Sequence, residues 1–371
     1  MRSQRLSRDA LFDVLGTGCS VEHSASLDPR TFLKSPGLEL LRTSAAPDAE
    51  ASASGARNTV SCYRLSHLPP GSEEILVEHC GESVAGGCLV DREQLGGDDT
   101  GVALWPDAFA LCAWLAANHQ EIEGSDVLEL GCGTGLCSLV AAQLGARRVA
   151  LTDGSQRSID FLHKNVGRNA EMTKRVGTVA TVTSLKWGEP FLAPDSKMAE
   201  TFGLIMGSGL VYRELTAEGA RQLMQTVATS LRAEPAAPSG SKEDGDGGKQ
   251  VQRTPLFVVG HCVRGVADEG TDFAGHMSLL DAGVSFGFRC DVVPSTGSCA
   301  LVPRSAELTV LVFRREPDAT AAAASAQAAC QQLETMGESF NDTLAGSKAA
   351  ARALRAARAA RKSQRSEPYP T

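Results

Sequence analysis

The chain has 371 residues, 42% of them apolar, which is enough for one large domain or two small ones with a substantial core. Its 36 Lys and Arg residues against 44 Asp and Glu residues give a formal net charge of −8, which argues against nucleic-acid binding by the whole surface. The charge is uneven, because residues 346–366 hold seven basic residues and no acidic one. Subtracting this +7 from −8 leaves −15 on the other 350 residues, so an acidic body carries a basic tail.

Signals for targeting and metal binding are sparse. No run approaches the roughly 18–20 apolar residues of a membrane span, and the N-terminus lacks an apolar signal-peptide stretch. The 11 cysteines are scattered without a CxxC pair, which argues against a zinc site and for reduced thiols. We therefore expect a cytoplasmic protein, with the nucleus as an alternative, that has neither membrane contact nor a metal.

The first predicted elements are short strands. Residues 1–56 are rich in Ser, Ala, Arg and Asp and are predicted to be flexible, with a short helix near Ala10–Leu15. Within residues 57–100, apolar runs between Gly/Pro turns predict a small β extension, with strands at 59–65, 73–80 and 86–90. Apolar residues at helical spacing then predict a helix over 103–120.

Strands and helices alternate from Asp126 onward. Buried strands are predicted at 126–131, 148–153, 178–185, 202–209, 256–264, 288–295 and 307–315. The helices predicted between them cover 135–146, 155–169, 214–232 and 268–282. Repeated β–α units of this kind predict an α/β domain over residues 101–316, with a mostly parallel sheet covered by helices on both faces and two final strands that pair antiparallel.

Two segments of biased composition stand apart from this alternation. Residues 233–253 are rich in Gly, Pro and charge and are predicted to be a flexible loop insertion. Residues 317–371 form an Ala-rich tail in which basic residues recur about every three positions from Arg352 to Arg365. A solvated, weakly ordered tail is the leading interpretation, and contact with nucleic acid or an acidic partner is the alternative.

The most informative segment is a glycine loop between a strand and a helix. The sequence from Val127 reads VLELGCGTG, and glycines lie at 131, 133 and 135. Glycines allow a sharp turn and close ligand approach, while the following helix offers unpaired N–H groups. A dinucleotide-binding loop needs glycine at the sixth position of G-x-G-x-x-G, where this chain has Leu136, so a nicotinamide cofactor fits poorly.

An acidic residue follows at the end of the next strand. Asp153 lies 22 residues after Gly131, where a carboxylate can accept hydrogen bonds from both hydroxyls of a ribose. The alternative is an N-cap for the helix predicted at 155–169. Together the loop and the acid indicate an adenosine-type ligand at the carboxyl end of the sheet.

The motifs VLELGCGTGL, RRVALTD and FLHKNVGRN resemble those of the seven-β-strand, S-adenosylmethionine-dependent methyltransferases. The stretches GVALWPDAFALCAWL, SLKWGEPF and FGLIMGSGLVY are similar to the protein-lysine methyltransferase branch, and the match covers roughly residues 85–315. The resemblance implies a Rossmann-like sheet of seven strands, mostly parallel with the last strand antiparallel, and S-adenosyl-L-methionine as the cofactor.

The resemblance also implies roles for individual residues. Trp105 would lie beside the methionine end of the cofactor, where an aromatic face can stabilise a sulfonium, and Trp187 would flank the adenine. Each tryptophan has plain packing as its alternative. Asp153 would hold the ribose, and Ser208 would line the pocket. The loop residues that would bind the cofactor are Gly131, Cys132 and Gly133, which would contact it through the backbone, and Gly135.

One motif departs from the family pattern. The fourth-strand motif of the family is Asp-x-x-Tyr, with the Asp beside the acceptor nitrogen, whereas this chain has Gly209 and keeps Tyr212 as the candidate catalytic residue. Lysine has a pKa of about 10.4, so an acid there helps to position the ammonium. Ser208, Glu214 or an acid from another loop are the candidate replacements.

The resemblance therefore implies a methyltransferase that acts on a protein side chain, most simply lysine. The protein substrate could be a translation factor or a chaperone, and the acidic body favours a cationic acceptor. One alternative keeps the cofactor and changes the acceptor to histidine, arginine or a small molecule. Another is a catalytically silent methyltransferase fold that acts as a binding module. We expect a monomer that contacts nucleic acid only through its tail.

Overall fold

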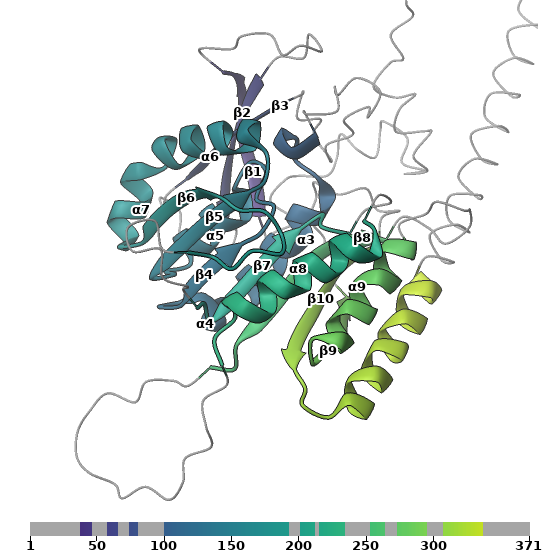
Figure 1. Ribbon diagram of the computed structural model, residues 1–371. Helices are drawn as coiled ribbons and strands as arrows, with labels where there is room; N and C mark the ends of the chain where they lie inside the picture. Colours follow the sequence, from purple (N-terminus) through teal and green to yellow (C-terminus); the bar gives the residue numbers. More distant parts are fainter. Residues whose placement is uncertain are drawn as a thin grey trace, which may run out of the picture.

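The computed structural model describes residues 38–46, 58–65, 74–80, 100–192, 201–211, 215–233, 253–263, 273–294 and 307–336. These residues form one sheet of seven strands covered by helices, and a separate sheet of three strands near the N-terminus (Figure 1). In the part of the chain so described, no helix is both long and apolar enough to cross a membrane.

The seven-stranded sheet has the order β6-β5-β4-β7-β8-β10-β9. Its strands are β4 (Asp126–Glu129), β5 (Arg148–Asp153), β6 (Val179–Ser184), β7 (Leu204–Ser208), β8 (Leu256–Val263), β9 (Phe288–Pro294) and β10 (Glu307–Arg315). The strands from β4 to β8 run parallel, and β10 is antiparallel to both β8 and β9. The predicted fold, a Rossmann-like mostly parallel sheet whose last strand is antiparallel, is confirmed.

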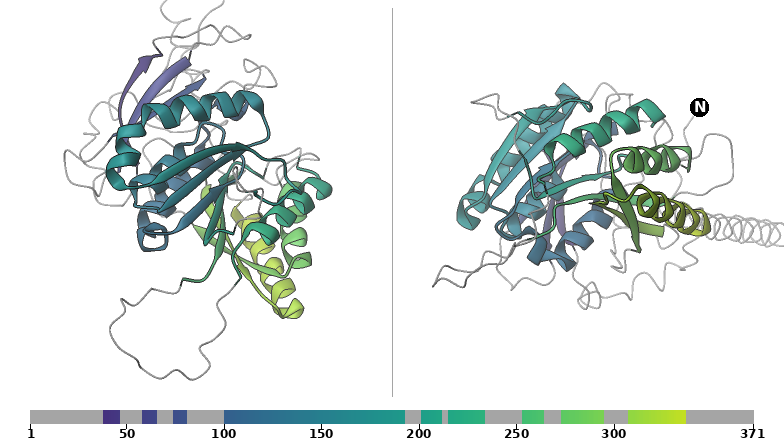
Figure 2. Two further views of the ribbon diagram at one scale, coloured as in Figure 1. Left: turned by 60° about the vertical axis from the view of Figure 1, so that its left-hand side comes forward. Right: turned by 60° about the horizontal axis from the view of Figure 1, so that its bottom comes forward.

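Helices cover both faces of this sheet (Figure 2). Within the described residues between 100 and 294, the helices are α3 (Pro106–Ala117), α4 (His119–Ile122), α5 (Leu136–Gln143), α6 (Gln156–Arg168), α7 (Ala170–Val176), α8 (Ala217–Ser230) and α9 (Phe273–Ser285), with a 3-10 turn at Thr100–Val102. Successive strand residues point to opposite faces, so Val127 packs in the core beneath α3, α5 and α6, and Leu128 packs beneath α8 and α9. Burial on both faces explains why these strands are almost continuously apolar.

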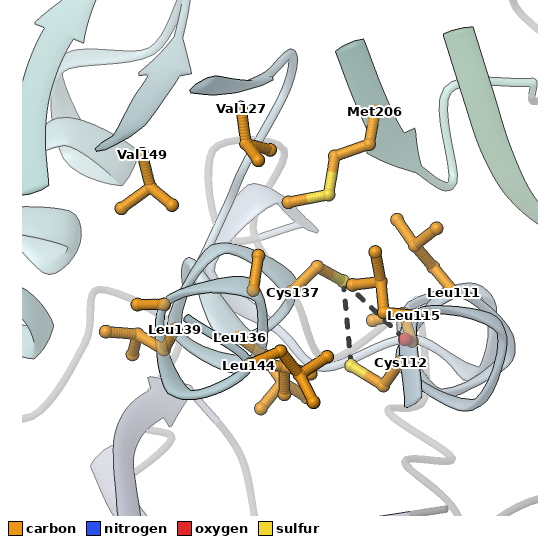
Figure 3. Close-up of a cluster of buried hydrophobic side chains, with 14 of the residues drawn as sticks. Leu111, Cys112, Leu115, Val127, Leu136, Cys137, Leu139, Leu144, Val149 and Met206 are labelled. Atoms are coloured by element: carbon orange, nitrogen blue, oxygen red, sulfur yellow. Dashed lines mark hydrogen bonds between the residues drawn. The ribbon is translucent and has the colours of Figure 1, made fainter. Parts of the chain in front are cut away.

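The core between α3 and α5 lies directly below the glycine loop. Figure 3 shows side chains from both helices packed against Val127, Val149 and Met206 of the sheet. Cys137 of α5 places its Sγ 3.9 Å from Sγ of Cys112 on α3. This contact involves the first turn of α5, which begins immediately after the loop.

The N-terminal sheet consists of β1 (Leu38–Ala45), β2 (Asn58–Leu65) and β3 (Ile75–Cys80), all antiparallel. The strands predicted at 59–65 and 73–80 are confirmed, and the strand at 86–90 lies outside the described residues. The flexible segment predicted for 1–56 is wrong for residues 38–45, which form β1. Pairing with β2 stabilises this strand, and such a long-range contact leaves no local sequence signal.

Asn165 of α6 and Asn169, the C-cap residue of α6, attach the N-terminal sheet to the main domain. Asn165 accepts the N–H of Glu78 at 2.7 Å and donates to the carbonyls of Glu78 (2.9 Å) and Thr134 (2.8 Å). Asn169 bonds the N–H of Leu76 at 2.9 Å and its carbonyl at 2.6 Å. Since Thr134 belongs to the glycine loop, one buried amide connects the outer sheet, α6 and the loop.

The domain also extends beyond its predicted end at residue 316. Residues 319–336 are helical, and Ala329 and Leu333 are buried in the same core as α8 and α9. The Ser325 hydroxyl donates to the carbonyl of Cys290 in β9 at 2.7 Å. The predicted boundary of the tail is therefore wrong, because this helix covers β9. The basic stripe, the helix near Ala10–Leu15 and residues 234–252 of the predicted loop insertion lie outside the described residues.

Candidate functional site

The glycine loop after β4 has a backbone that only glycine adopts easily. Gly131, Gly133 and Gly135 have φ angles of 61°, 55° and 81°, in the left-handed region. A Cβ added at Gly133 would lie 2.2 Å from the carbonyl oxygen of Gly101. The segment that leads into α3 therefore lies directly against the loop, and glycine at 133 is what allows this approach.

The other loop glycines make different close contacts. A Cβ at Gly131 would lie 2.9 Å from Cδ2 of Leu210 and 3.9 Å from Cζ2 of Trp187. A Cβ at Gly135 would lie 2.7 Å from Cδ2 of Leu162. Gly131 thus lies close to the tryptophan predicted to flank the adenine, whereas Gly135 serves the packing of α6 against the loop.

Asp153 holds the loop from the adjacent strand. Its Oδ2 accepts the N–H of Gly133 at 3.0 Å, and its Oδ1 accepts the N–H of Ser155 at 2.9 Å. Burial raises the pKa of Asp153 above its usual range, and the two N–H donors oppose that shift. Ser155, not Asp153, is the N-cap residue of α6. The carboxylate is therefore an acceptor fixed between the loop and the start of α6.

The backbone N–H and carbonyl of Cys132 both form hydrogen bonds within the protein. Its N–H donates to the carbonyl of Thr152 at 2.9 Å, and its carbonyl accepts the N–H of Gly135 at 2.9 Å. Its buried Sγ accepts the N–H of Thr152 at 3.0 Å. The predicted cofactor contact of Cys132 would therefore be one of van der Waals packing.

The two predicted tryptophans lie on different elements. Trp105 is the N-cap residue of α3, half-buried, and packs with Val102, Ala103 and Phe161. Trp187 follows β6, is also half-buried, and packs at the edge of the core beneath α8. Neither residue is fully buried, and their assigned roles stay predictions.

Ser208, Tyr212 and Glu214 were predicted to lie at the end of β7, and the structure describes the first of them. Ser208 ends β7, half-buried, with its Oγ 3.8 Å from Sγ of Cys137. Tyr212 and Glu214 lie outside the described residues, so the candidate catalytic tyrosine stays a prediction.

Two buried acids near the loop were given no role from the sequence. Glu129, at the end of β4, accepts the N–H of Ser138 at 2.9 Å and its hydroxyl at 2.5 Å, and burial raises the pKa of Glu129 to about 7. Asp107 lies in the first turn of α3, with its Cβ and Cγ each 3.9 Å from the position of a Cβ at Gly209. An acid in the first turn of a helix is ordinary because of the helix dipole, so no sequence signal singled out Asp107.

The arrangement fits an adenosine-type cofactor. The ligand crevice of such a sheet lies beyond the carboxyl ends of its strands, where the strand order reverses, which here is between β4 and β7. The glycine loop follows β4, the Asp153 carboxylate ends β5, and Trp187 follows β6 beside Gly131. The close contacts at Gly131 and Gly133 leave no room for a side chain at either of these loop positions.

Comparison with known proteins supports the same family. Residues 89–241 match the family described as lysine methyltransferase, which confirms the resemblance noted from the motifs. Protein N-lysine methyltransferase METTL21A of Danio rerio is 34% identical over 139 residues, which cover 38% of this chain and 59% of that protein. Calmodulin-lysine N-methyltransferase of Arabidopsis thaliana is 29% identical over 142 residues, which cover 38% of this chain and 44% of that protein.

The crystal structure of the glycopeptide N-methyltransferase MtfA aligns with 57% of this chain and 97% of its own, at a TM-score of 0.39 and 13% identity. The fold assignment therefore rests on the strand order and directions of this chain. The chain spans about half the length of the curated relatives it matches.

Proposed function

We propose that this protein is an S-adenosylmethionine-dependent methyltransferase that acts on a lysine side chain of a protein. The juxtaposition of Gly133 and Asp153 carries the proposal. Their 3.0 Å hydrogen bond brings a carboxylate acceptor to the glycine loop, and the Trp187 ring lies beside the same loop. The match of residues 89–241 to the lysine methyltransferase family supports the choice of acceptor.

The residues of this chain would bind and orient the reactants. Asp153 would accept hydrogen bonds from the ribose hydroxyls, and Trp187 would cover one face of the adenine. Trp105, on the segment packed against Gly133, would place its ring near the sulfonium. The bound cofactor supplies an electrophilic methyl group on sulfur. The rate would then come mainly from holding the acceptor amine in line with that methyl group, away from water.

The acceptor protein is identified only by its chemistry. The excess of acidic residues on this chain favours a lysine-bearing segment of net positive charge. A translation factor or a chaperone is a suitable candidate, and we propose a monomer that acts on it.

Cofactor binding is the first test. Titration calorimetry with S-adenosylhomocysteine should show binding to the wild-type protein, and Asp153→Ala should weaken it roughly 10- to 100-fold, because charge-assisted hydrogen bonds to the ribose are lost. Asp160→Ala is the matched control. Asp160 is an exposed acid of α6 whose Oδ1 accepts a hydrogen bond from the exposed Gln156 side chain at 2.9 Å. Equal affinities of the Asp153 and Asp160 variants would contradict the proposed site.

Transfer is the second test. Incubating a whole-cell extract with the protein and methyl-tritiated cofactor should label protein, and hydrolysis of that protein should release methyl-lysine. Label on histidine or arginine would replace the proposed acceptor with another, and cofactor binding without any transfer would support a binding module.

A further inference from the structure

A group of arginines lies at the amino ends of the parallel strands, at the edge of the sheet opposite the glycine loop. This group, which we call the arginine cluster, consists of Arg147, Arg148, Arg232 and Arg253. Its members lie at the start of β5, after α8 and before β8. Since β5 has six residues that each rise about 3.3 Å, roughly 20 Å of strand separates the cluster from the carboxylate of Asp153. The cluster is therefore separate from the site proposed for methyl transfer.

Three of these arginines meet at one buried carboxylate oxygen. Oδ2 of Asp126, at the start of β4, lies 2.5 Å from Nη2 of Arg147. Nη2 of Arg148 and Nη2 of Arg232 lie 3.6 and 3.7 Å from the same oxygen. The other oxygen of Asp126, Oδ1, is buried and accepts no hydrogen bond from the described residues. One negative charge thus faces three positive charges, and this crowding of like charges costs free energy that a further anion would relieve.

The fold orients the guanidinium groups but leaves two of them accessible. Cζ of Arg148 lies 4.9 Å from the centroid of the Phe202 ring, and Nη1 of Arg253 donates to a backbone carbonyl of the turn before β4 at 2.5 Å. The side chains of Arg147 and Arg232 are nevertheless 67% and 53% exposed. A guanidinium carries five N–H donors in a planar fork, so a group that pairs with Asp126 can also bind a second carboxylate. Because these groups are already oriented, a ligand loses less free energy in ordering them.

The charges around the cluster indicate which anion it suits. The acids among the residues that the cluster contacts are Asp126 and Glu123, so four positive charges face two negative ones. The whole chain carries a net charge of −8, and a long polyanion such as a nucleic acid would be repelled by the rest of this surface. A short acidic segment of a protein needs only a local positive patch of this kind.

We propose that the arginine cluster is a docking site for an acidic segment of a partner protein. Asp or Glu carboxylates of that segment accept charge-assisted hydrogen bonds from Arg147 and Arg232, the two exposed members of the cluster. Arg148 stays with Asp126 and keeps the site oriented. This inference goes beyond the proposed function and does not depend on it.

Binding of a model acidic peptide tests the proposal. The full chain is titrated into a fluorescein-labelled peptide of six glutamates, and fluorescence anisotropy is measured. The wild type should bind the peptide, and the affinity should fall as the salt concentration rises from about 0.05 to 0.5 M, because salt screens exposed ion pairs. The double variant Arg147→Gln with Arg232→Gln should bind roughly 5- to 30-fold more weakly, since two ion pairs with the peptide are lost. Each single substitution should give an intermediate loss.

The basic tail provides the matched control. Arg352→Gln with Arg355→Gln removes the same charge from residues 346–366 and should weaken peptide binding by less than about 2-fold. Urea unfolding followed by circular dichroism shows whether each variant is folded. If the Arg147 and Arg232 double variant does not fold, the two single variants, each of which keeps two arginines beside Asp126, decide the result.

Four results would overturn the assignment. They are no peptide binding by the wild type, wild-type affinity in the folded cluster variants, an equal loss of affinity in the tail variant, and tighter binding of a six-nucleotide oligothymidylate through Arg147 and Arg232. The last result would assign the cluster to nucleic acid. A wild-type protein that binds the peptide but no S-adenosylhomocysteine would instead contradict the proposed function and leave this docking site supported.

Discussion

Replacing Gly133 with alanine tests the central geometric feature of the loop. The added methyl group would meet the carbonyl oxygen of Gly101 at 2.2 Å, far inside van der Waals contact. It would also sit on a backbone with a φ of 55°. The loop, or the segment before α3, would have to move, and with it the N–H that bonds Asp153.

The magnitude follows from these two costs. A non-glycine residue in the left-handed region costs about 1–2 kcal/mol. Relieving an overpacked contact costs about 1–3 kcal/mol more. We therefore expect Gly133→Ala to lower the free energy of unfolding by about 2–5 kcal/mol, and to weaken S-adenosylhomocysteine binding because the Gly133–Asp153 contact is displaced.

A substitution at a second glycine, Gly177, separates the steric cost of the added methyl group from the cost of the left-handed backbone. Gly177, after α7, has a φ of 78°, and a Cβ there meets no atom of the described residues within 4 Å. Gly177→Ala should therefore lose only the backbone cost, about 1–2 kcal/mol, and keep its affinity for S-adenosylhomocysteine. Urea unfolding followed by circular dichroism gives the first quantity, and calorimetry gives the second. If the two variants are equal in both, the close approach of Gly101 to the loop is not present in solution.

Two further predictions concern buried polar groups. Asn165→Ala should lower the free energy of unfolding by about 2–4 kcal/mol in urea titrations, because three buried hydrogen bonds of the outer sheet and loop are lost, whereas exposed Gln156→Ala on the same helix should change little. Glu129 has a folded pKa of about 7 against an ordinary 4.5, so ionising it inside the fold is unfavourable and its contribution to stability falls as pH rises through that interval. Relative to Glu129→Gln, the wild type should lose about 3 kcal/mol between pH 4.5 and 8 in urea titrations at several pH values, and a pH-independent difference would contradict burial of the acid.

The elements of the main sheet could be predicted because their signals are local. Continuous apolar runs with turn residues between them mark strands that are covered on both faces, and the loop glycines mark the backbone that needs positive φ. The same local reasoning failed for β1 and for the domain boundary at residue 316, although the Ala/Gln-rich composition of 317–345 did indicate a helix. Residues 38–45 form a strand because β2 lies beside them, and the helix belongs to the domain because β9 offers it an apolar surface.

Some residues of the candidate site could be predicted from the sequence, and others could not. Asp153 and the loop glycines are separated by about 20 positions and follow neighbouring strands, so their meeting could be predicted from the chain. The burial of Asp107 could not be predicted, because it depends on contacts with residues more than 100 positions away in the sequence. The contact with Gly209 and the bond from Cys262 exist only once α3 is packed across β7 and β8.

A third glycine explains how Asp107 comes so close to the end of β7. At Gly260 in β8, a Cβ would lie 2.5 Å from the carbonyl oxygen of Asp107 and 2.6 Å from Cβ of Leu111. The first turn of α3 therefore lies directly on β8 because Gly260 has no side chain. The Gly209 N–H donates to the Gly260 carbonyl at 3.2 Å, so both glycines belong to one contact between the strand ends. The end of β7 and the first turn of α3 thus meet in a single packing arrangement, which depends on the missing side chains of Gly209 and Gly260.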